Sequence, residues 1–197
     1  MYENLYEKIV GALVENGYVV LENALDSTLA KELFNKAKNA TNYKRAGVSA
    51  SSALHLDETK RRDKILWLDN DGGCVSDYLS FSNGLKEYLN YSLSLGVNNF
   101  EAHFARYDSG DFYAKHLDAF KNSKNRVVTT VYYLNEAWEK EDGGELLVYD
   151  ENDKLIKEIL PKQNTLVIFM SAKFPHEVLP PRKERFSIAG WFRIDIR

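Results

Sequence analysis

The hydrophobic period of this chain changes near its middle, and that change constrains the fold more than any other feature. Before Gly96, apolar residues recur at helical spacing, as Leu5, Ile9 and Leu13 do. After Gly96, apolar and polar residues alternate, and turn-forming sequences follow at short intervals. Alternation is typical of half-buried strands, whereas helical spacing indicates a helix that buries one face. Helices followed by short strands predict an α+β domain, in which helices brace a β-sandwich or barrel.

The N-terminal part is expected to hold three helices and one buried strand. The first helix should end at Gly17, because glycine readily adopts the left-handed conformation that closes many helices. Asp26 can cap a second helix, and a third is expected from Ser82 to Gly96. The apolar run at 18–21 predicts a strand between the first two helices.

The C-terminal half predicts six strands. Their expected ranges are 100–106, 126–134, 145–149, 155–159, 165–170 and 185–196. Between the second and third expected helices, residues 44–62 lose any apolar period and predict a mobile loop that could act as a lid.

Length and composition favour one cytoplasmic domain. The chain has 197 residues, of which 44% are hydrophobic, so one domain with a sizeable core is expected. The formal net charge is -3 without a long basic run, which argues against nucleic acid or an anionic membrane as partner. Cys74 is the single cysteine, the start lacks a signal-peptide pattern, and no apolar stretch is long enough to span a bilayer.

A metal site is predicted from a His-x-Asp motif in the strand-rich half. Residues two apart on a strand share a face, so His116 and Asp118 could reach the same ion. The tripeptide recurs at His55 and Asp57, but there it lies in the polar loop. His176, which follows a long apolar strand, supplies a distant third ligand for the first motif.

The ligand types favour iron over zinc. Two imidazoles and one carboxylate on one face of a metal leave positions open for a bidentate ligand and dioxygen. This arrangement is typical of non-haem iron(II) oxygenases, and the absence of nearby cysteine disfavours a structural zinc site.

Arg185 begins an apolar strand and needs a partner if it points inward, because an unpaired buried charge is costly. That partner could be a protein carboxylate. A ligand carboxylate is the other possibility, since the planar guanidinium binds one through two hydrogen bonds. Ser187 on the same face and Tyr133 on another strand could each add a hydroxyl.

Six blocks of this sequence closely resemble the prolyl 4-hydroxylases, particularly the oxygen-sensing type and its bacterial relatives. The blocks are Tyr107 and residues 116–118, 131–135, 143–146, 175–178 and 185–191. The resemblance extends over most of the chain and implies a double-stranded β-helix, or jelly-roll. It divides one domain, 1–197, into a helical support and lid region, 1–96, and a catalytic core, 97–197.

The resemblance also implies a set of site residues and cofactors. Iron(II) would bind His116, Asp118 and His176, while Arg185 and Tyr133 would bind the distal carboxylate of 2-oxoglutarate, beside Tyr107. The residues expected to line the pocket are Leu146, Val178 and Trp191. Dioxygen would be the oxidant and ascorbate the expected reductant. The implied reaction hydroxylates a prolyl residue of a cytosolic protein and releases succinate and CO2.

Three alternatives remain open at this point. The chain could hydroxylate a small molecule such as a free amino acid, which a closed polar pocket would favour over an open groove. It could be a non-catalytic jelly-roll binding module, although the complete triad argues against that. A cupin-like metal isomerase is disfavoured by the ligand order. Outside the motifs, His103 is expected to be a surface or hydrogen-bonded residue, and Trp67 and Trp138 are expected to be core or loop anchors.

Overall fold

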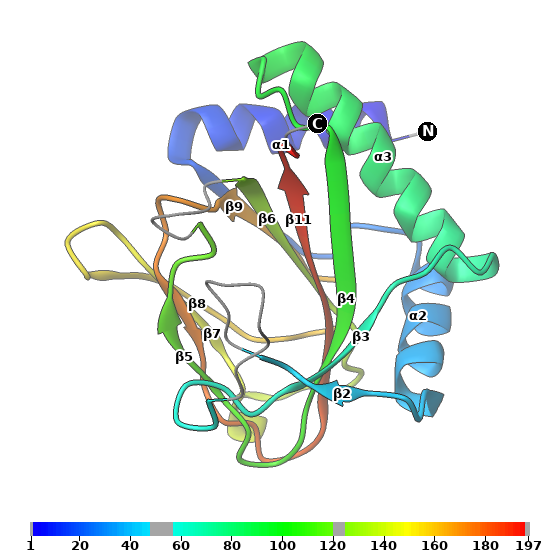
Figure 1. Ribbon diagram of the computed structural model, residues 1–197, viewed down its shortest axis with the longest axis vertical. Coiled ribbons are helices and arrows are strands. Elements are labelled where there is room, and N and C mark those ends of the chain that lie inside the picture. Colours follow the sequence, from blue (N-terminus) through cyan, green and yellow to red (C-terminus); the bar gives the residue numbers. More distant parts are fainter. Residues whose placement is uncertain (1, 48–56, 120–124, 196–197) are drawn as a thin grey trace.

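The structure is a computed structural model that describes residues 2–47, 57–119 and 125–195. Two antiparallel β-sheets face each other, and three helices pack on the outer side of the larger sheet (Figure 1). The helices are α1 (Glu3–Asn16), α2 (Ser27–Asn39) and α3 (Gly73–Leu93), with a short 3-10 helix at Lys140–Asp142.

The larger sheet has seven strands and the smaller sheet has four. In spatial order the larger sheet holds β1 (Tyr18–Leu21), β9 (Leu166–Met170), β6 (Arg126–Tyr133), β11 (Arg185–Arg193), β4 (Asn99–Tyr107), β3 (Lys64–Trp67) and β2 (Lys44–Arg45). The smaller sheet holds β5 (Tyr113–His116), β10 (His176–Val178), β7 (Leu146–Tyr149) and β8 (Leu155–Ile159). This pair of facing antiparallel sheets is the expected jelly-roll.

Alternation along the strands separates two apolar layers. On β6, Val128 and Tyr132 pack against the helices. Val131 and Tyr133, which lie on either side of Tyr132 in the sequence, point to the layer between the two sheets. Successive side chains of a strand point to opposite faces, so one strand serves both layers. The layer between the sheets is therefore the place where inward-facing polar side chains can meet.

The first two helices end and begin where the sequence predicted. Gly17 has a φ of 77°, and its N–H donates a hydrogen bond to the carbonyl of Leu13. The Asp26 carboxylate caps α2 by accepting from the N–H groups of Thr28 and Leu29, at 2.8 and 3.3 Å. A carboxylate at this end also interacts favourably with the helix dipole.

The predicted start of the third helix was wrong. α3 begins at Gly73, well before Ser82, and places Cys74 in its first turn. The Ser82 hydroxyl donates to the carbonyl of Tyr78 one turn back, at 2.9 Å, as serine does inside helices. The helix also ends earlier than expected, at Ser94, whose φ of 53° supplies the left-handed residue assigned to Gly96.

Several short strands were not predicted. They include β5 and β10, and part of the expected loop 44–62 forms β2, which pairs with β3. Within that loop, residues 48–56, which include His55, lie outside the described residues. None of the described helices is long and apolar enough to cross a membrane.

Candidate iron and 2-oxoglutarate site

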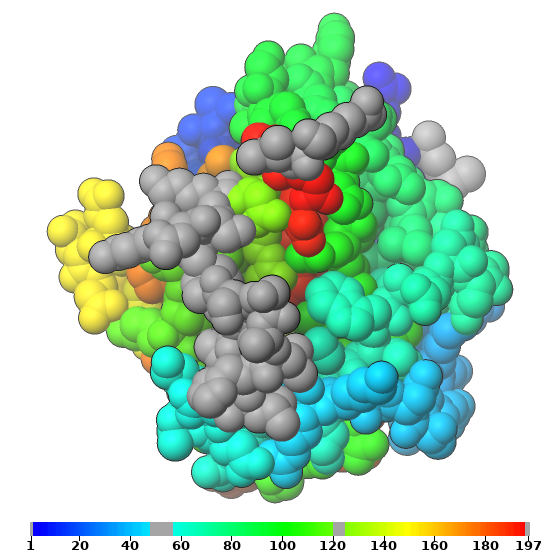
Figure 2. Space-filling view, in the orientation of Figure 1, coloured from blue at the N-terminus to red at the C-terminus, as the bar shows by residue number. Residues whose placement is uncertain are grey.

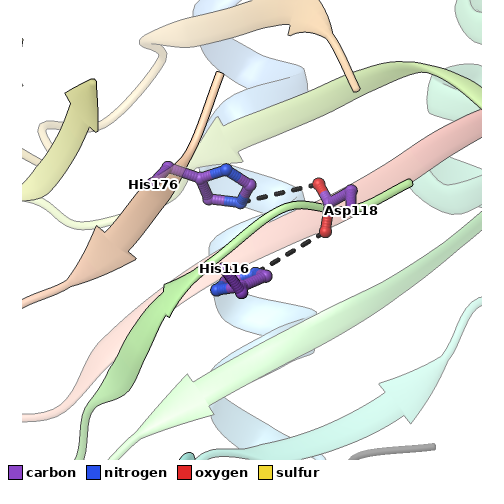
Figure 3. Close-up of side chains that lie close together, drawn as sticks. All are labelled: His116, Asp118 and His176. Atoms are coloured by element: carbon purple, nitrogen blue, oxygen red, sulfur yellow. Dashed lines mark ion pairs between the residues drawn. The ribbon is translucent and has the colours of Figure 1, made fainter. Parts of the chain in front are cut away.

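The two histidines of the predicted triad face each other across neighbouring strands. His116 ends β5 and His176 begins β10, and their Cα atoms are register partners in the smaller sheet. Both imidazoles point toward the carboxylate of Asp118 (Figure 3). His116 Nε2 lies 3.6 Å from Asp118 Oδ1, and His176 Nε2 lies 3.5 Å from Asp118 Oδ2.

The three ligand atoms fit a single ion. One donor atom from each residue lies within 4.8 Å of the other two. The imidazole–carboxylate separations exceed ordinary hydrogen-bond lengths. Two imidazole nitrogens and one hard carboxylate suit iron(II). Among the residues that the structure describes, this is the one cluster of metal-ligating side chains.

Backbone carbonyls fix which ring nitrogen each histidine presents. Nδ1 of His116 lies 2.8 Å from the carbonyl of Ala114, and Nδ1 of His176 lies 3.0 Å from the carbonyl of Phe174. A carbonyl oxygen can only accept, so each Nδ1 carries the hydrogen. Each Nε2 is then left with a free lone pair aimed at the metal position.

The charge states of the triad also suit a metal. Burial, together with His116, lowers the pKa of His176 to about 4, so this imidazole is neutral at pH 7. Burial alone would raise the pKa of the Asp118 carboxyl, but His176 and His116 hold it below its usual range. His176 and Asp118 therefore offer a metal ion a neutral nitrogen and an anionic oxygen, and neither group has to lose a proton first.

Asp118 does not lie on the same strand as His116, so the geometric reason for the predicted pairing was wrong. β5 ends at His116, and Asp118 sits in the bend that follows. Its carboxylate is positioned from the larger sheet instead. Thr129 of β6 donates to Asp118 Oδ2 at 2.8 Å, and the Thr129 hydroxyl is also 2.8 Å from that of Ser171. All three side chains are buried.

Arg185 is buried at the start of β11, where only 1% of its surface is exposed. Its Nε donates to the carbonyl of Gly144 at 2.9 Å, and its Nη1 lies 3.4 Å from the hydroxyl of Ser187. The guanidinium carbon is 4.9 Å from the Tyr107 ring centroid and 5.1 Å from that of Tyr133. No described carboxylate forms an ion pair with it, which argues against a structural ion pair.

Tyr133 carries another unused polar group beside Arg185. Its side chain is buried, and no described residue forms a hydrogen bond of normal geometry with its hydroxyl. Burial raises the pKa of Tyr133 to about 12, although Arg185 acts in the opposite direction, so the phenol stays protonated and can donate. A buried hydroxyl without a partner and a buried guanidinium without a carboxylate are both costly, so a ligand carboxylate at this point would stabilise both groups.

The triad and Arg185 open into one cavity of about 240 Å³ between the two sheets. All three residues predicted to line the pocket, Leu146, Val178 and Trp191, border it. Of the predicted cosubstrate contacts, Tyr107 and Ser187 also border it, whereas Tyr133 is not among its lining residues. On the face shown in the space-filling view, the red C-terminal part of the chain reaches the surface between green and yellow-green segments, in the region of β4 and β6 (Figure 2).

Comparison with known proteins assigns the family. A model of the 2OG-Fe(II) oxygenase superfamily matches residues 102–193. Human prolyl hydroxylase EGLN3 is 30% identical over 197 residues, which cover 94% of this chain and 82% of that protein. The chain belongs to the prolyl hydroxylase family of 2-oxoglutarate- and iron(II)-dependent oxygenases. The family resemblance predicted from the sequence is thereby confirmed.

Solved structures of prolyl hydroxylases agree with the fold. A prolyl-4-hydroxylase from Pseudomonas putida is 33% identical, with a TM-score of 0.88 over 97% of this chain and 100% of that one. A prolyl hydroxylase from Trichoplax adhaerens, in complex with a peptide of the hypoxia inducible factor oxygen degradation domain, is 27% identical, with a TM-score of 0.85 over 97% and 90% of the chains.

Some curated relatives are much longer than this chain, which spans less than half of their length. The hypoxia-inducible factor prolyl hydroxylase of Caenorhabditis elegans is 30% identical over 203 residues, which are 94% of this chain but 28% of that protein. For human Egl nine homolog 1 the shared part is 46% of the relative.

Two predictions about residues outside the motifs were wrong. His103 is neither at the surface nor hydrogen-bonded through Nδ1: it is 3% exposed, lines the cavity, and has no described partner for that atom. Trp67 lines the same cavity but is 47% exposed, whereas Trp138 is buried as expected. The alternation of side chains along β4 and β3 could have indicated that His103 and Trp67 point inward. A single histidine or tryptophan does not by itself indicate a binding site.

Two further arginines belong to the cavity wall. Arg61 is paired with Asp63 through contacts of 2.7 and 2.6 Å. Arg126 is 2.9 Å from Glu101 and stacks over the Trp191 ring, with its guanidinium carbon 3.7 Å from the ring centroid. Both arginines border the cavity. The loop 44–62 thus contributes Arg61, near its end, to the cavity wall.

Proposed function

We propose that this chain is a dioxygenase that hydroxylates a prolyl residue of a cytosolic protein and converts 2-oxoglutarate to succinate and CO2. The observation that carries the cosubstrate assignment is Arg185, a buried guanidinium in the same cavity as the triad with no described carboxylate to balance it. A bound carboxylate would supply that charge through paired hydrogen bonds. Ser187 and Tyr133 would add hydroxyl contacts to the same carboxylate.

In this proposal His116, Asp118 and His176 hold iron(II). Iron(II) held there together with 2-oxoglutarate would supply the oxidation, in which one oxygen atom of dioxygen ends in succinate and the other in the hydroxylated product. The protein orients the reactants and excludes competing reactions. Tyr107, Leu146 and Val178 form walls that keep water from the cosubstrate.

A polypeptide substrate is supported by the rim of the cavity. Trp67 is half exposed and lies edge-on against His103, at a ring separation of 5.0 Å. Large exposed aromatic side chains beside a cavity are typical of sites that bind other proteins or peptides. The Trichoplax relative is described in complex with a peptide, and the Pseudomonas relative is described as a prolyl-4-hydroxylase.

The test is to find the product in cell extract. Purified protein, iron(II), 2-oxoglutarate and ascorbate are incubated under isotopically labelled dioxygen, in an extract from a strain of the source organism that lacks the gene. Mass spectrometry then searches both peptides and small metabolites for the label. We expect labelled hydroxyproline at one position of a protein. Label confined to free amino acids or other metabolites would contradict the polypeptide substrate and leave the dioxygenase chemistry in place.

A further inference from the structure

His103 is a buried polar side chain of the cavity that the proposed iron and 2-oxoglutarate sites leave unused. It lies in the middle of β4 between two indoles, at ring separations of 5.0 Å from Trp67 and 5.3 Å from Trp191. It is 3% exposed, and no described residue accepts from or donates to its Nδ1. A buried imidazole nitrogen without a partner is costly unless a ligand completes it.

The ring is uncharged under ordinary conditions. Burial, together with the positive charges of Arg61 and Arg126, lowers the pKa of His103 to about 3. A neutral imidazole has one N–H donor and one acceptor nitrogen. A half-turn of the imidazole about its bond to Cβ exchanges the position of Nδ1 with that of a ring carbon, and the ring fills nearly the same space. Either nitrogen can therefore face a ligand. Its natural partner is an uncharged polar group such as a peptide amide.

The other charges of the cavity wall point to the same class of ligand. Arg61 is balanced by Asp63, and Arg126 shares Glu101 with Arg193. Arg193 is in turn 2.6 Å from Asp195, so this second network holds two cations and two anions. Among the described residues that line the cavity, Arg185 is the one arginine left without a carboxylate.

That balance disfavours a free amino acid as primary substrate. In the proposed function, Arg185 binds 2-oxoglutarate, so the α-carboxylate of an amino acid would find no unpaired cation in the described wall. Burying an uncompensated carboxylate there would be strongly unfavourable. A proline within a polypeptide has neutral amides in place of the free carboxylate and amine.

We propose that His103 is a specificity-determining residue that hydrogen-bonds a backbone amide of the primary substrate and thereby selects a polypeptide over a free amino acid. This inference rests on the proposed function, because it assigns Arg185 to the cosubstrate. Trp67 and Trp191 hold the imidazole in place on both sides. They also give the cavity an apolar wall suited to a pyrrolidine ring.

Binding of defined probes to three proteins tests this role. The probes are a library of acetylated, amidated peptides with one central proline each, and free L-proline. The proteins are wild type, His103→Leu and His103→Gln, each loaded with zinc(II) as a redox-inactive metal and with 2-oxoglutarate. Isotopically labelled histidine side chains report binding by NMR, and cosubstrate affinity and thermal unfolding show whether each variant is folded.

We expect wild type to bind blocked peptides in preference to L-proline, with a shift of the His103 ring signals. His103→Leu should weaken peptide binding about tenfold, the usual value of one hydrogen bond, and His103→Gln should restore most of it. Equal peptide affinity in wild type and the leucine variant would overturn the role of His103 while leaving the proposed function intact. Preference of wild type for L-proline, or binding of neither probe, would overturn both.

Discussion

Thr129 Oγ1 donates a hydrogen bond of 2.8 Å to Asp118 Oδ2, so a strand of the larger sheet holds the carboxylate that follows β5 of the smaller sheet. Ser171 Oγ lies 2.8 Å from the same hydroxyl. The other carboxylate oxygen, Oδ1, lies 3.6 Å from His116 Nε2. Hydrogen-bonded groups behind metal ligands orient the ligands and commonly affect metal affinity.

Thr129→Val should therefore weaken metal binding without unfolding the protein. Loss of such a supporting hydrogen bond costs about 10–100-fold in metal affinity. Calorimetric titration with manganese(II) measures the change directly. Thr129→Ser should keep near-normal affinity, because it retains the hydroxyl.

Thr130→Val is the matched control, since Thr130 is also buried on β6 but its hydroxyl lies 3.3 Å from the carbonyl of Gly190 and away from Asp118. Equal manganese affinity in Thr129→Val and Thr130→Val would show that Thr129 does not position the ligand.

Arg185→Ala should reduce 2-oxoglutarate affinity by about 30-fold or more, because losing one partner of a buried charge pair costs roughly 2–5 kcal/mol. Arg185→Lys should recover part of it, since lysine keeps the charge but lacks the planar guanidinium. Calorimetry on the zinc-loaded protein gives both values. Arg182→Ala, an exposed arginine just before β11, is the control. Unchanged cosubstrate binding in Arg185→Ala would make Arg185 a structural residue.

Gly144→Ala should also impair cosubstrate binding, through Arg185. Gly144 has a φ of +73°, and an added Cβ would lie 3.0 Å from the Arg185 side chain. The substitution should strain the backbone and displace the guanidinium that its carbonyl holds. We expect about tenfold weaker 2-oxoglutarate binding, measured by calorimetry.

Gly96→Ala separates backbone strain from the displacement of Arg185. Gly96 has a similar φ of +69°, but no atom lies within 4 Å of the added Cβ. This substitution should lower the unfolding midpoint and leave cosubstrate affinity unchanged. Equal losses of affinity in the two variants would exclude the proposed displacement of Arg185.

The neutral state of His103 predicts a pH dependence of stability. Burial lowers its pKa from 6.5 to about 3 in the folded protein. Between these values the unfolded chain binds a proton at this residue and the folded protein does not, so its contribution to stability falls as pH falls below 6.5. For the metal-free protein, urea unfolding at pH 7 and pH 5 measures the change.

Between pH 7 and pH 5, the free energy of unfolding of wild type should fall by about 2 kcal/mol more than that of His103→Gln. Each pH unit changes the contribution of one titrating group by at most about 1.4 kcal/mol. His176 titrates in both proteins and cancels in the comparison. An identical pH dependence in the two proteins would show that folding does not lower the pKa of His103.

Much of the fold was predictable because local patterns and tertiary packing agree. The left-handed Gly17, the Asp26 cap and the long alternating strands each carry a signal within a few residues. The short strands β5 and β10 do not, because their pairing is fixed by neighbours distant in the chain. Ser82 misled the helix boundary, since the same hydroxyl can cap a helix or bond back inside one.

The site was predictable where its residue types stand out from their surroundings in the sequence. Imidazole and carboxylate ligands and a strand-borne arginine stand out, and Arg185 is where that reasoning expected it. His103, Thr129 and Trp67 do not stand out, because each could equally be an ordinary strand residue. Their roles depend on which face of β3, β4 or β6 points between the sheets, and on contacts with partners far along the chain.

An anaerobic optical titration tests directly whether the triad forms a single iron and 2-oxoglutarate site. Iron(II) added to the protein with 2-oxoglutarate should produce a visible charge-transfer band that saturates at one iron per chain. We predict that the band is lost in His176→Ala and retained in His55→Ala, which alters the rival His-x-Asp tripeptide. A band that persists in His176→Ala would contradict a single iron and 2-oxoglutarate site at His116, Asp118 and His176.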